Sequence, residues 1–219
     1  MHKIKFFTHL PLTLALAGLL SVGCQSDKQQ SSISQPPAPV VTPVVAAPVV
    51  ATAPVVATAP VADSTTLKPP VRIIAGSPAP YTDSNGNLWL PDQGFVGGDI
   101  VDRGSDVAIA NTKDPAIYRT EHFSMDSFSC KLPNGKYVVK LHFAETFVEG
   151  ITEPGQRVFS FSVNGREFKE FDVLVKAGGP LRPYIETVNT EITGGKLEII
   201  FTSKVENPEI NGIEILPAS

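Results

Sequence analysis

The sequence predicts an all-β fold, an antiparallel β-sandwich formed by residues 71–219. Within this range, short segments recur in which every second residue is apolar. A period of two indicates a half-buried strand, because successive side chains of a strand point to opposite faces. Turn dipeptides built from Asn, Gly and Pro separate the segments, and we find no window with the periodicity of an amphipathic helix.

The expected strands follow one another closely along the chain. The clearest is Tyr137–Phe143, which comes directly after the turn signal Asn134-Gly135. Another, Val158–Val163, is closed by the turn signal Asn164-Gly165. The remaining expected strands are Val71–Ala75, Ile117–Phe123, Phe168–Val175, Tyr184–Ile192, Lys196–Thr202 and Ile210–Leu216.

Two stretches between these strands need a separate interpretation. Residues 95–115 are rich in Gly and Asp and lack clear periodicity, so we expect an irregular excursion. Asp83 and Asn85 are spaced like the first ligands of a calcium loop, but the sixth position holds Leu88 where such a loop needs glycine. We therefore expect no metal and no other cofactor, and instead a hairpin turn at Asn85-Gly86 that presents Trp89.

Residues 1–24 have the pattern of a secretion signal. A positively charged start, Met1–Lys5, precedes the apolar stretch Phe6–Leu20, which is too short and wrongly flanked for a stable membrane span. The signal ends in Leu-Ser-Val-Gly-Cys, which resembles the lipobox of bacterial lipoproteins.

This resemblance implies lipid attachment at Cys24. One difference is that Ser21 stands three residues before the cysteine, where lipoboxes usually have leucine. Gln25, rather than aspartate, follows the cysteine, as in lipoproteins sorted to the outer membrane. The expected location is therefore the cell envelope, with the protein held on the outer membrane by its N-terminal lipid. The alternative is an ordinary secretory signal with an incidental cysteine.

Residues 25–70 are expected to form a disordered linker. A Pro-Val-Val-Ala pattern recurs there, with prolines at 43, 48, 54 and 60. Regular prolines remove backbone donors and bias the preceding residue toward extended geometry, so neither helix nor sheet is favoured. At roughly 3 Å per residue, the part Pro36–Pro70, fully extended, reaches on the order of 100 Å. We interpret it as a spacer between the lipid and the sandwich.

Charge and cysteine content exclude several function classes. The chain has 18 Lys and Arg against 22 Asp and Glu, a net charge of −4. A nucleic-acid binder would show a basic surplus, so no nucleic-acid partner is expected. Two cysteines, Cys24 and Cys130, are too few for a disulfide framework, and we expect Cys130 to pack as a small hydrophobe.

Catalytic patterns are weak in the sequence. His122 and His142 lie inside expected strands and are not spaced as a metal pair, so we interpret them as sheet-face histidines. Glu121, Glu145 and Glu206 could converge, but two carboxylates make a glycosidase only at a fixed separation in a substrate cleft. We therefore favour a protein that is not an enzyme over this alternative.

Sugar binding requires aromatic rings and hydrogen-bonding side chains on loops. Rings stack on the apolar face of a pyranose, and carboxylate or amide groups bond its hydroxyls. The long loop Thr146–Gln156 between two clear strands carries such residues, and loops on a rigid scaffold often hold binding sites. The candidate site residues are Tyr118, Phe123, Phe147, Glu149, Glu206 and Asn207. The alternative is that the aromatic residues belong to the core.

Several segments together resemble the malectin domain family. The opening VRIIAGSPAPYTDSNGNLWLPD is similar to the start of that domain. The segments Ile117–Phe123, Leu141–Glu145, Arg157–Gly165 and Glu206–Ile215 then follow in the family's order. The resemblance covers essentially 71–216, and it implies a jelly-roll β-sandwich that binds an oligo- or polysaccharide without catalysis. A structural or protein-interaction module of the envelope that has lost sugar binding is the alternative.

The resemblance also implies where a sugar pocket lies. By local match, the pocket positions of animal malectin fall at Phe123, Phe147, Val148 and Glu206, where that protein has two tyrosines, a phenylalanine and an aspartate. A further tyrosine matches only the neighbourhood of Val107. Losing tyrosine hydroxyls removes specific hydrogen bonds, so the fold carries over to this chain while the preference for glucose does not.

Overall fold

The computed structural model describes residues 65–219. The expected signal, the expected lipid site at Cys24 and the expected linker as far as residue 64 lie outside the described residues. The first described segment leads into the sandwich. The backbone N–H of Leu67 donates to the Lys131 carbonyl at 2.9 Å, and the Leu67 side chain packs against the core.

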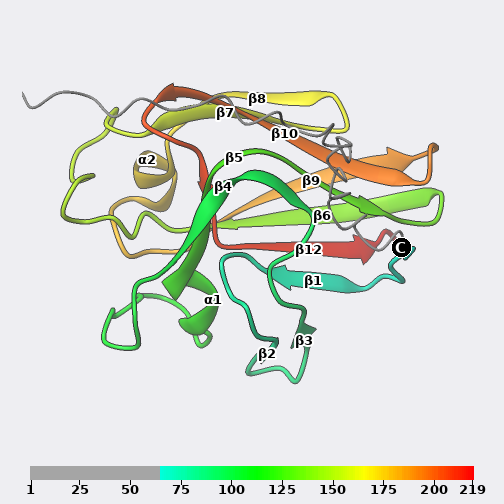
Figure 1. The fold of residues 1–219 in the computed structure, drawn as a ribbon, viewed down its shortest axis with the longest axis horizontal. Coiled ribbons are helices and arrows are strands. Elements are labelled where there is room, and N and C mark those ends of the chain that lie inside the picture. Colours follow the sequence, from blue (N-terminus) through cyan, green and yellow to red (C-terminus); the bar gives the residue numbers. More distant parts are fainter. Residues whose placement is uncertain (1–64) are drawn as a thin grey trace, which may run out of the picture. The chain divides into compact units, whose positions relative to one another are not determined.

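Two main antiparallel sheets face each other in the described part of the chain (Figure 1). The four-stranded sheet has, in order, β1 (Val71–Ile74), β12 (Gly212–Pro217), β6 (Gly135–Phe143) and β9 (Tyr184–Ile192). The six-stranded sheet has β11 (Glu209–Ile210), β5 (Thr120–Lys131), β10 (Lys196–Val205), β7 (Val158–Val163) and β8 (Arg166–Phe171), with β4 (Phe95–Asp102) paired to β5. The expected antiparallel β-sandwich is confirmed.

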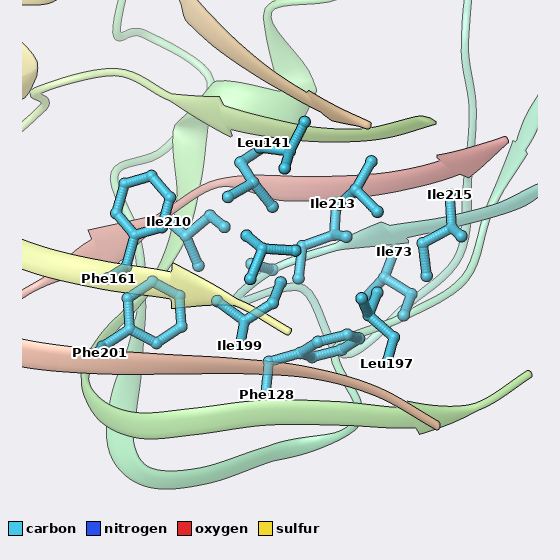
Figure 2. Packing of buried hydrophobic residues seen from close by; sticks show 14 of the residues in the cluster. Ile73, Phe128, Leu141, Phe161, Leu197, Ile199, Phe201, Ile210, Ile213 and Ile215 are labelled. Carbon is cyan, nitrogen blue, oxygen red and sulfur yellow. The ribbon is translucent and has the colours of Figure 1, made fainter. Parts of the chain in front are cut away.

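The core fills the space between the two sheets. In β6, Val139, Leu141 and Phe143 are fully buried, while Lys140 between them is only partly buried, as the period of two predicts. Figure 2 shows how apolar side chains from both sheets meet: Ile73, Leu141, Ile213 and Ile215 from one, and Phe128, Phe161, Leu197, Ile199, Phe201 and Ile210 from the other. Burying a side chain of this size contributes about 1.5–3 kcal/mol.

A small hairpin forms where the Asn-Gly turn predicts one. It joins β2 (Tyr81–Thr82) to β3 (Leu88–Trp89). The Asp83 carboxylate accepts hydrogen bonds from the Asn87 side chain and from Trp89 Nε1, the latter at 3.1 Å. Burial acts to raise the pKa of Asp83, but the hydrogen bonds from Asn87 and Trp89 outweigh it and lower the pKa to about 2. The hairpin turns Trp89 inward, where it is 2 % exposed.

The expectation of an irregular excursion over 95–115 is wrong for its first part. Residues 95–102 form β4, which pairs along β5 with a register shift between Val96 and Gly97. Gly98 has a φ of 80°, and a Cβ there would lie 2.3 Å from the Phe123 carbonyl oxygen. Only glycine fits so close to the neighbouring backbone. The glycines that allow this pairing also interrupt the alternation of apolar and polar residues by which a strand is recognised in a sequence.

Two short helices replace parts of expected strands. Ile117 and Tyr118 lie in α1 (Ala116–Arg119), so the expected strand Ile117–Phe123 begins only at Thr120. β8 ends at Phe171, and α2 (Val173–Ala177) follows. Its first turn is capped by the Asp172 carboxylate, which accepts from Val175 N at 3.0 Å. Both helices are too short to show a helical period in the sequence. Neither helix of the described part is long and apolar enough to span a bilayer.

Candidate functional site

A pocket of about 200 Å³ opens at one end of the sandwich. Four parts of the chain that are distant in sequence form it: the end of β4, the start of β5, the loop between β6 and β7, and the segment after β10. The lining residues are Val101, Arg103, Glu121, Phe123, Phe147, Arg157, Glu206 and Asn207.

Strand register explains why side chains of β4 and β5 meet there, with β11 on the other side of β5. Val101 pairs with Glu121, and Glu209 pairs with Phe123. Directly paired residues of an antiparallel sheet send their side chains to the same face, as do residues two apart on one strand. The carboxyl group of Glu121 and the ring of Phe123 therefore rise side by side from the sheet into the pocket.

One ion pair on the pocket wall joins β5 to the residue after β4. Arg103 Nη2 donates to Glu121 Oε1 at 2.5 Å, and Arg103 Nε donates to Thr146 Oγ1 at 3.2 Å. The Thr146 hydroxyl in turn donates to Glu121 Oε2 at 2.6 Å. The Glu121 side chain is 2 % exposed and that of Arg103 is 21 % exposed, so the arginine faces the opening.

A second, more deeply buried ion pair holds the loop between β6 and β7. Arg157 Nε donates to Glu145 Oε2 at 2.7 Å, and Glu145 Oε1 accepts from the backbone N–H of Phe147 at 3.0 Å. Arg157 Nη1 also donates to the Asn207 carbonyl at 2.6 Å. Burial acts to lower the pKa of Arg157, but the charge of Glu145 and its hydrogen bond to the guanidinium outweigh it and raise that pKa.

Two phenylalanine rings supply the apolar surface of the pocket. Phe147 sits on the loop and is 36 % exposed, with the Arg103 guanidinium carbon 5.4 Å from its ring centre. Its carbonyl accepts backbone hydrogen bonds from Gly150 and Ile151, which fold the loop back below it. Phe123 is partly buried on β5. The pocket thus combines aromatic faces with charged hydrogen-bonding groups.

Four of the six candidate residues meet in this pocket: Phe123, Phe147, Glu206 and Asn207. Glu149 lies exposed on the same loop but does not line the pocket, and neither does Val148. Tyr118 was expected on a loop and is instead buried in α1, where its hydroxyl is hydrogen-bonded to His142 Nδ1 at 2.8 Å. Burial raises the pKa of this tyrosine.

Sequence reasoning missed Val101, Arg103 and Arg157 as lining residues. Arg103 lies within the stretch taken to be irregular, so nothing linked it to β5. Arg157 could have been found from the sequence, because it lies at the end of a long loop and directly before an apolar strand. A charged residue that is buried at such a place needs a partner of opposite charge. Glu121 was considered only as a catalytic acid. It does share the pocket with Glu206, whereas Glu145 lies behind it.

The two histidines lie on the sheets, as expected. His122 Nδ1 is 2.9 Å from Asp92 Oδ2, and His142 Nε2 is 3.0 Å from Glu214 Oε1. Both rings are mostly buried, so they belong to hydrogen-bond networks between strands. Within residues 65–219, no group of three or more His, Cys, Asp or Glu side chains is arranged to hold a metal ion.

An antiparallel sandwich with a recessed, partly aromatic pocket at its loop end is the architecture of a binding module. The family model for the malectin domain matches residues 70–213. The chain therefore belongs to the malectin domain family, whose members are modules that bind carbohydrate ligands and are typically non-catalytic.

Relatives of known sequence are plant receptor proteins. A probable LRR receptor-like serine/threonine-protein kinase of Arabidopsis thaliana, At1g29720, is 34% identical over 92 residues, covering 39% of this chain and 9% of its own length. Receptor-like protein 4 of the same plant is 33% identical over 85 residues, covering 38% of this chain and 13% of its own. The chain thus spans only a small part of these relatives.

Solved structures with the same fold come from bacteria and plants. A beta-glucuronidase of Bacteroides uniformis superposes with a TM-score of 0.61 at 21% identity, covering 70% of this chain and 19% of that protein. The ANXUR1 extracellular domain of Arabidopsis thaliana superposes with a TM-score of 0.57 at 18% identity, covering 67% of this chain and 47% of that protein. At these identities, the similarity establishes the fold alone.

Proposed function

We propose that this chain binds carbohydrate without catalysis, and that the sugar occupies the pocket between Phe123 and Phe147. The observation that carries the proposal is the presence of two aromatic rings beside the Arg103–Glu121 ion pair in one recess. A ring can stack on the apolar face of a pyranose. The arginine can donate to one hydroxyl while the carboxylate accepts from the next, so the pair suits two neighbouring hydroxyl groups.

The charge balance favours an uncharged sugar. Both guanidinium groups of the pocket are already engaged, Arg103 with Glu121 and Arg157 with Glu145. Glu206 at the rim adds negative charge. A sugar carboxylate would add a further negative charge beside Glu121 and Glu206, so we expect uronic acids to bind more weakly than the corresponding neutral sugars.

The size of the pocket limits how much ligand it encloses. Its volume of about 200 Å³ is below the roughly 300–1,000 Å³ of pockets that enclose a drug-sized molecule. We expect it to hold one unit of a longer glycan. Stacking contributes about 1 kcal/mol beyond area burial, and a hydrogen bond to a charged group roughly 1.5–3 kcal/mol. After the cost of association, the affinity should be weak, on the order of micromolar to millimolar.

The proposed place of action is the bacterial cell envelope. This part of the proposal rests on the sequence of residues 1–70, where a secretion signal ends at Cys24 and a proline-rich linker follows. Lipid on Cys24 would hold the protein to the outer membrane, and the linker would let the sandwich reach glycans at a distance from it.

Non-catalysis is supported by the state of the carboxylates near the pocket. Glu121 and Glu145 are each committed to an arginine, and Glu206 is exposed. A glycosidase needs one carboxyl group free as an acid and another free as a nucleophile or base, flanking the scissile bond. Incubating array-positive glycans with the chain should therefore release no reducing sugar.

A glycan array probed with the full chain tests the proposal. We expect binding to a set of neutral glycans and weaker binding to matched glycans in which the terminal sugar carries a carboxylate. Binding confined to carboxylated glycans would contradict the charge argument. Binding to none would favour the alternative function, a structural or protein-interaction module of the envelope.

A further inference from the structure

Glu209 lies fully buried beside the pocket, and neither oxygen of its carboxyl group has a hydrogen-bond partner among the described residues. It opens β11, whose register sets it opposite Phe123 of β5. The two side chains therefore rise from the same face of the sheet, and Phe123 lines the pocket. Both ring nitrogens of His142 on β6 are hydrogen-bonded to other residues, one to the Tyr118 hydroxyl and one to the Glu214 carboxylate.

Four charged groups lie close enough to Glu209 to affect the ionisation of its carboxyl group. Glu121 comes from β5, Arg103 from the end of β4, and Glu145 and Arg157 from the two ends of the loop between β6 and β7. The two arginines already pair with Glu121 and Glu145. Glu209 is thus a third carboxyl group in a cluster that holds only two cations.

This arrangement favours the neutral form of Glu209. Burial is the main cause that raises its pKa well above the ordinary value, and the carboxylates of Glu121 and Glu145 raise it further. Arg157 and Arg103 act in the opposite direction but do not cancel these effects. Buried charges that lack a partner are unfavourable, and such a group instead takes up its proton.

We propose that Glu209 stays protonated in the folded protein and acts as a positioning residue, leaving Arg103 and Arg157 free to hold the walls of the pocket. When Glu209 loses its proton, it becomes a third anion that competes for the same two guanidinium groups. The pocket is therefore organised while the acid is neutral and loosens when it ionises.

The contacts of Arg157 show how the change would reach the pocket mouth. Arg157 donates to the Asn207 carbonyl, and its partner Glu145 accepts from the backbone N–H of Phe147. An Arg157 drawn toward ionised Glu209 loosens both links at once. We expect Phe147 and Asn207 to be displaced when Glu209 ionises, whatever the pocket binds. The further expectation that sugar affinity falls at high pH rests on the proposed function.

The sign of the effect on stability follows from the raised folded-state pKa. The unfolded chain binds this proton only below about pH 4.3, the ordinary value for glutamate. The stabilising contribution of the neutral acid is fully present below that pH and is lost as the pH rises through the folded-state value. Glu209→Gln keeps the shape of the neutral acid and cannot ionise, so the variant should gain stability relative to the parent as the pH rises.

Carbon NMR of the full chain labelled at its glutamate carboxyl groups tests the proposal without any ligand. In the parent, we expect one glutamate to titrate above the ordinary range, and we expect the backbone amides of Phe147 and Asn207 to shift with the same midpoint. Glu209→Gln should remove that titration and hold both amides at their low-pH positions. Glu191→Gln, an exposed glutamate on β9, is the matched control and should change neither.

Two results would overturn the proposal. The first is a Glu209 carboxyl that titrates in the ordinary glutamate range in the parent. The second is a raised titration with no accompanying shift at Phe147 or Asn207, which would make Glu209 a buried acid without a positioning role. Because the parent alone decides both, the outcome does not depend on whether the variant folds. An array without hits would refute the sugar proposal and leave this one standing.

Discussion

At the scale of single residues, two ion pairs determine the shape of the pocket. The side chains of Arg157 and Glu145 are 5 % and 1 % exposed. A buried pair of this kind stabilises a fold little compared with apolar residues of the same size, but removing one partner leaves an uncompensated buried charge. The Arg157–Glu145 pair therefore specifies the position of the loop, and its loss should be costly.

Arg157→Leu should lower the free energy of unfolding by about 3–5 kcal/mol, because Glu145 then remains buried without its partner. Urea denaturation at neutral pH measures this. The matched control is Lys204→Ala, which breaks the exposed ion pair with Glu170 and should leave the unfolding midpoint nearly unchanged. If the two substitutions lower the free energy of unfolding equally, burial of the Arg157–Glu145 pair is not the reason for its contribution to stability.

The residue scale also explains how this pocket differs from that of animal malectin, as judged from the resemblance in sequence. The resemblance implies that Phe123 and Phe147 replace two tyrosines of that protein. A phenylalanine ring can stack on a sugar but has no hydroxyl group for hydrogen bonds. Arg103 and Glu121 place hydrogen-bonding groups in the same recess. The recess therefore remains both aromatic and polar, with its polar groups on different side chains.

At the scale of elements, β4 determines whether the pocket forms. It is the strand that carries Val101 and leads to Arg103, and among the strands of residues 65–219 it pairs only with β5. Most of its side chains are exposed, so packing contributes little to its position. Its antiparallel pairing with β5 holds it in place, and Gly98 permits this pairing because nothing larger than hydrogen fits between the two backbones there.

Gly98→Ala should separate β4 from β5 and destabilise the domain more than Gly104→Ala does. Both glycines have positive φ, 80° and 85°, so both substitutions carry the backbone cost of about 1–2 kcal/mol. Only at Gly98 does the new Cβ also meet the Phe123 carbonyl, whereas nothing lies within 4 Å at Gly104. Thermal unfolding of the two variants measures the difference, and equal midpoints would contradict the role given to this contact.

The elements differ in how well the sequence reveals them. β6 and β7 were predictable, because one face of each is buried and the other is not, so apolar residues alternate. β4 is exposed along most of its length and glycine-rich, so no alternation exists to detect. α1 and α2 have four and five residues, too few to display a helical period.

The sequence predicts those residues of the candidate site whose place depends only on the segment that contains them. Phe147 could be found because it sits on a long loop between two clear strands, and Glu206 and Asn207 because they match a family segment. Arg103 could not, because its place in the pocket depends on the pairing of β4 with β5. Tyr118 differs from its expected place for another reason, because the segment that contains it forms the short helix α1, which buries its ring.

At the scale of the whole molecule, we propose that the two parts of the chain have different roles. Residues 71–219 supply the fold and the pocket, while residues 1–70 carry the expected signal, lipid site and spacer. A weak sugar site of the kind proposed becomes more effective when the protein is held at a surface rich in its ligand, because many tethered copies raise the local concentration.

Cys24→Ser should abolish lipid attachment and leave the signal unprocessed by the lipoprotein route. Labelling of cells with palmitate, followed by membrane fractionation, checks this: the parent should carry label and sediment with membranes. If the variant also incorporates label and fractionates with the outer membrane, the expectation of a lipobox at Cys24 fails, and the alternative of an ordinary secretory signal has to be considered again.

The most direct test of the central claim is the affinity of the parent, Phe147→Ala and Glu206→Ala for the strongest glycan found on the array. Both side chains lie at the pocket opening and contribute little to the core, so thermal midpoints should stay nearly unchanged. Each variant should lose at least about tenfold in affinity, equivalent to roughly 1.4 kcal/mol. Val175→Ala, an exposed apolar residue on α2 outside the pocket, should bind like the parent. If both pocket variants fold and also bind like the parent, the sugar site lies elsewhere.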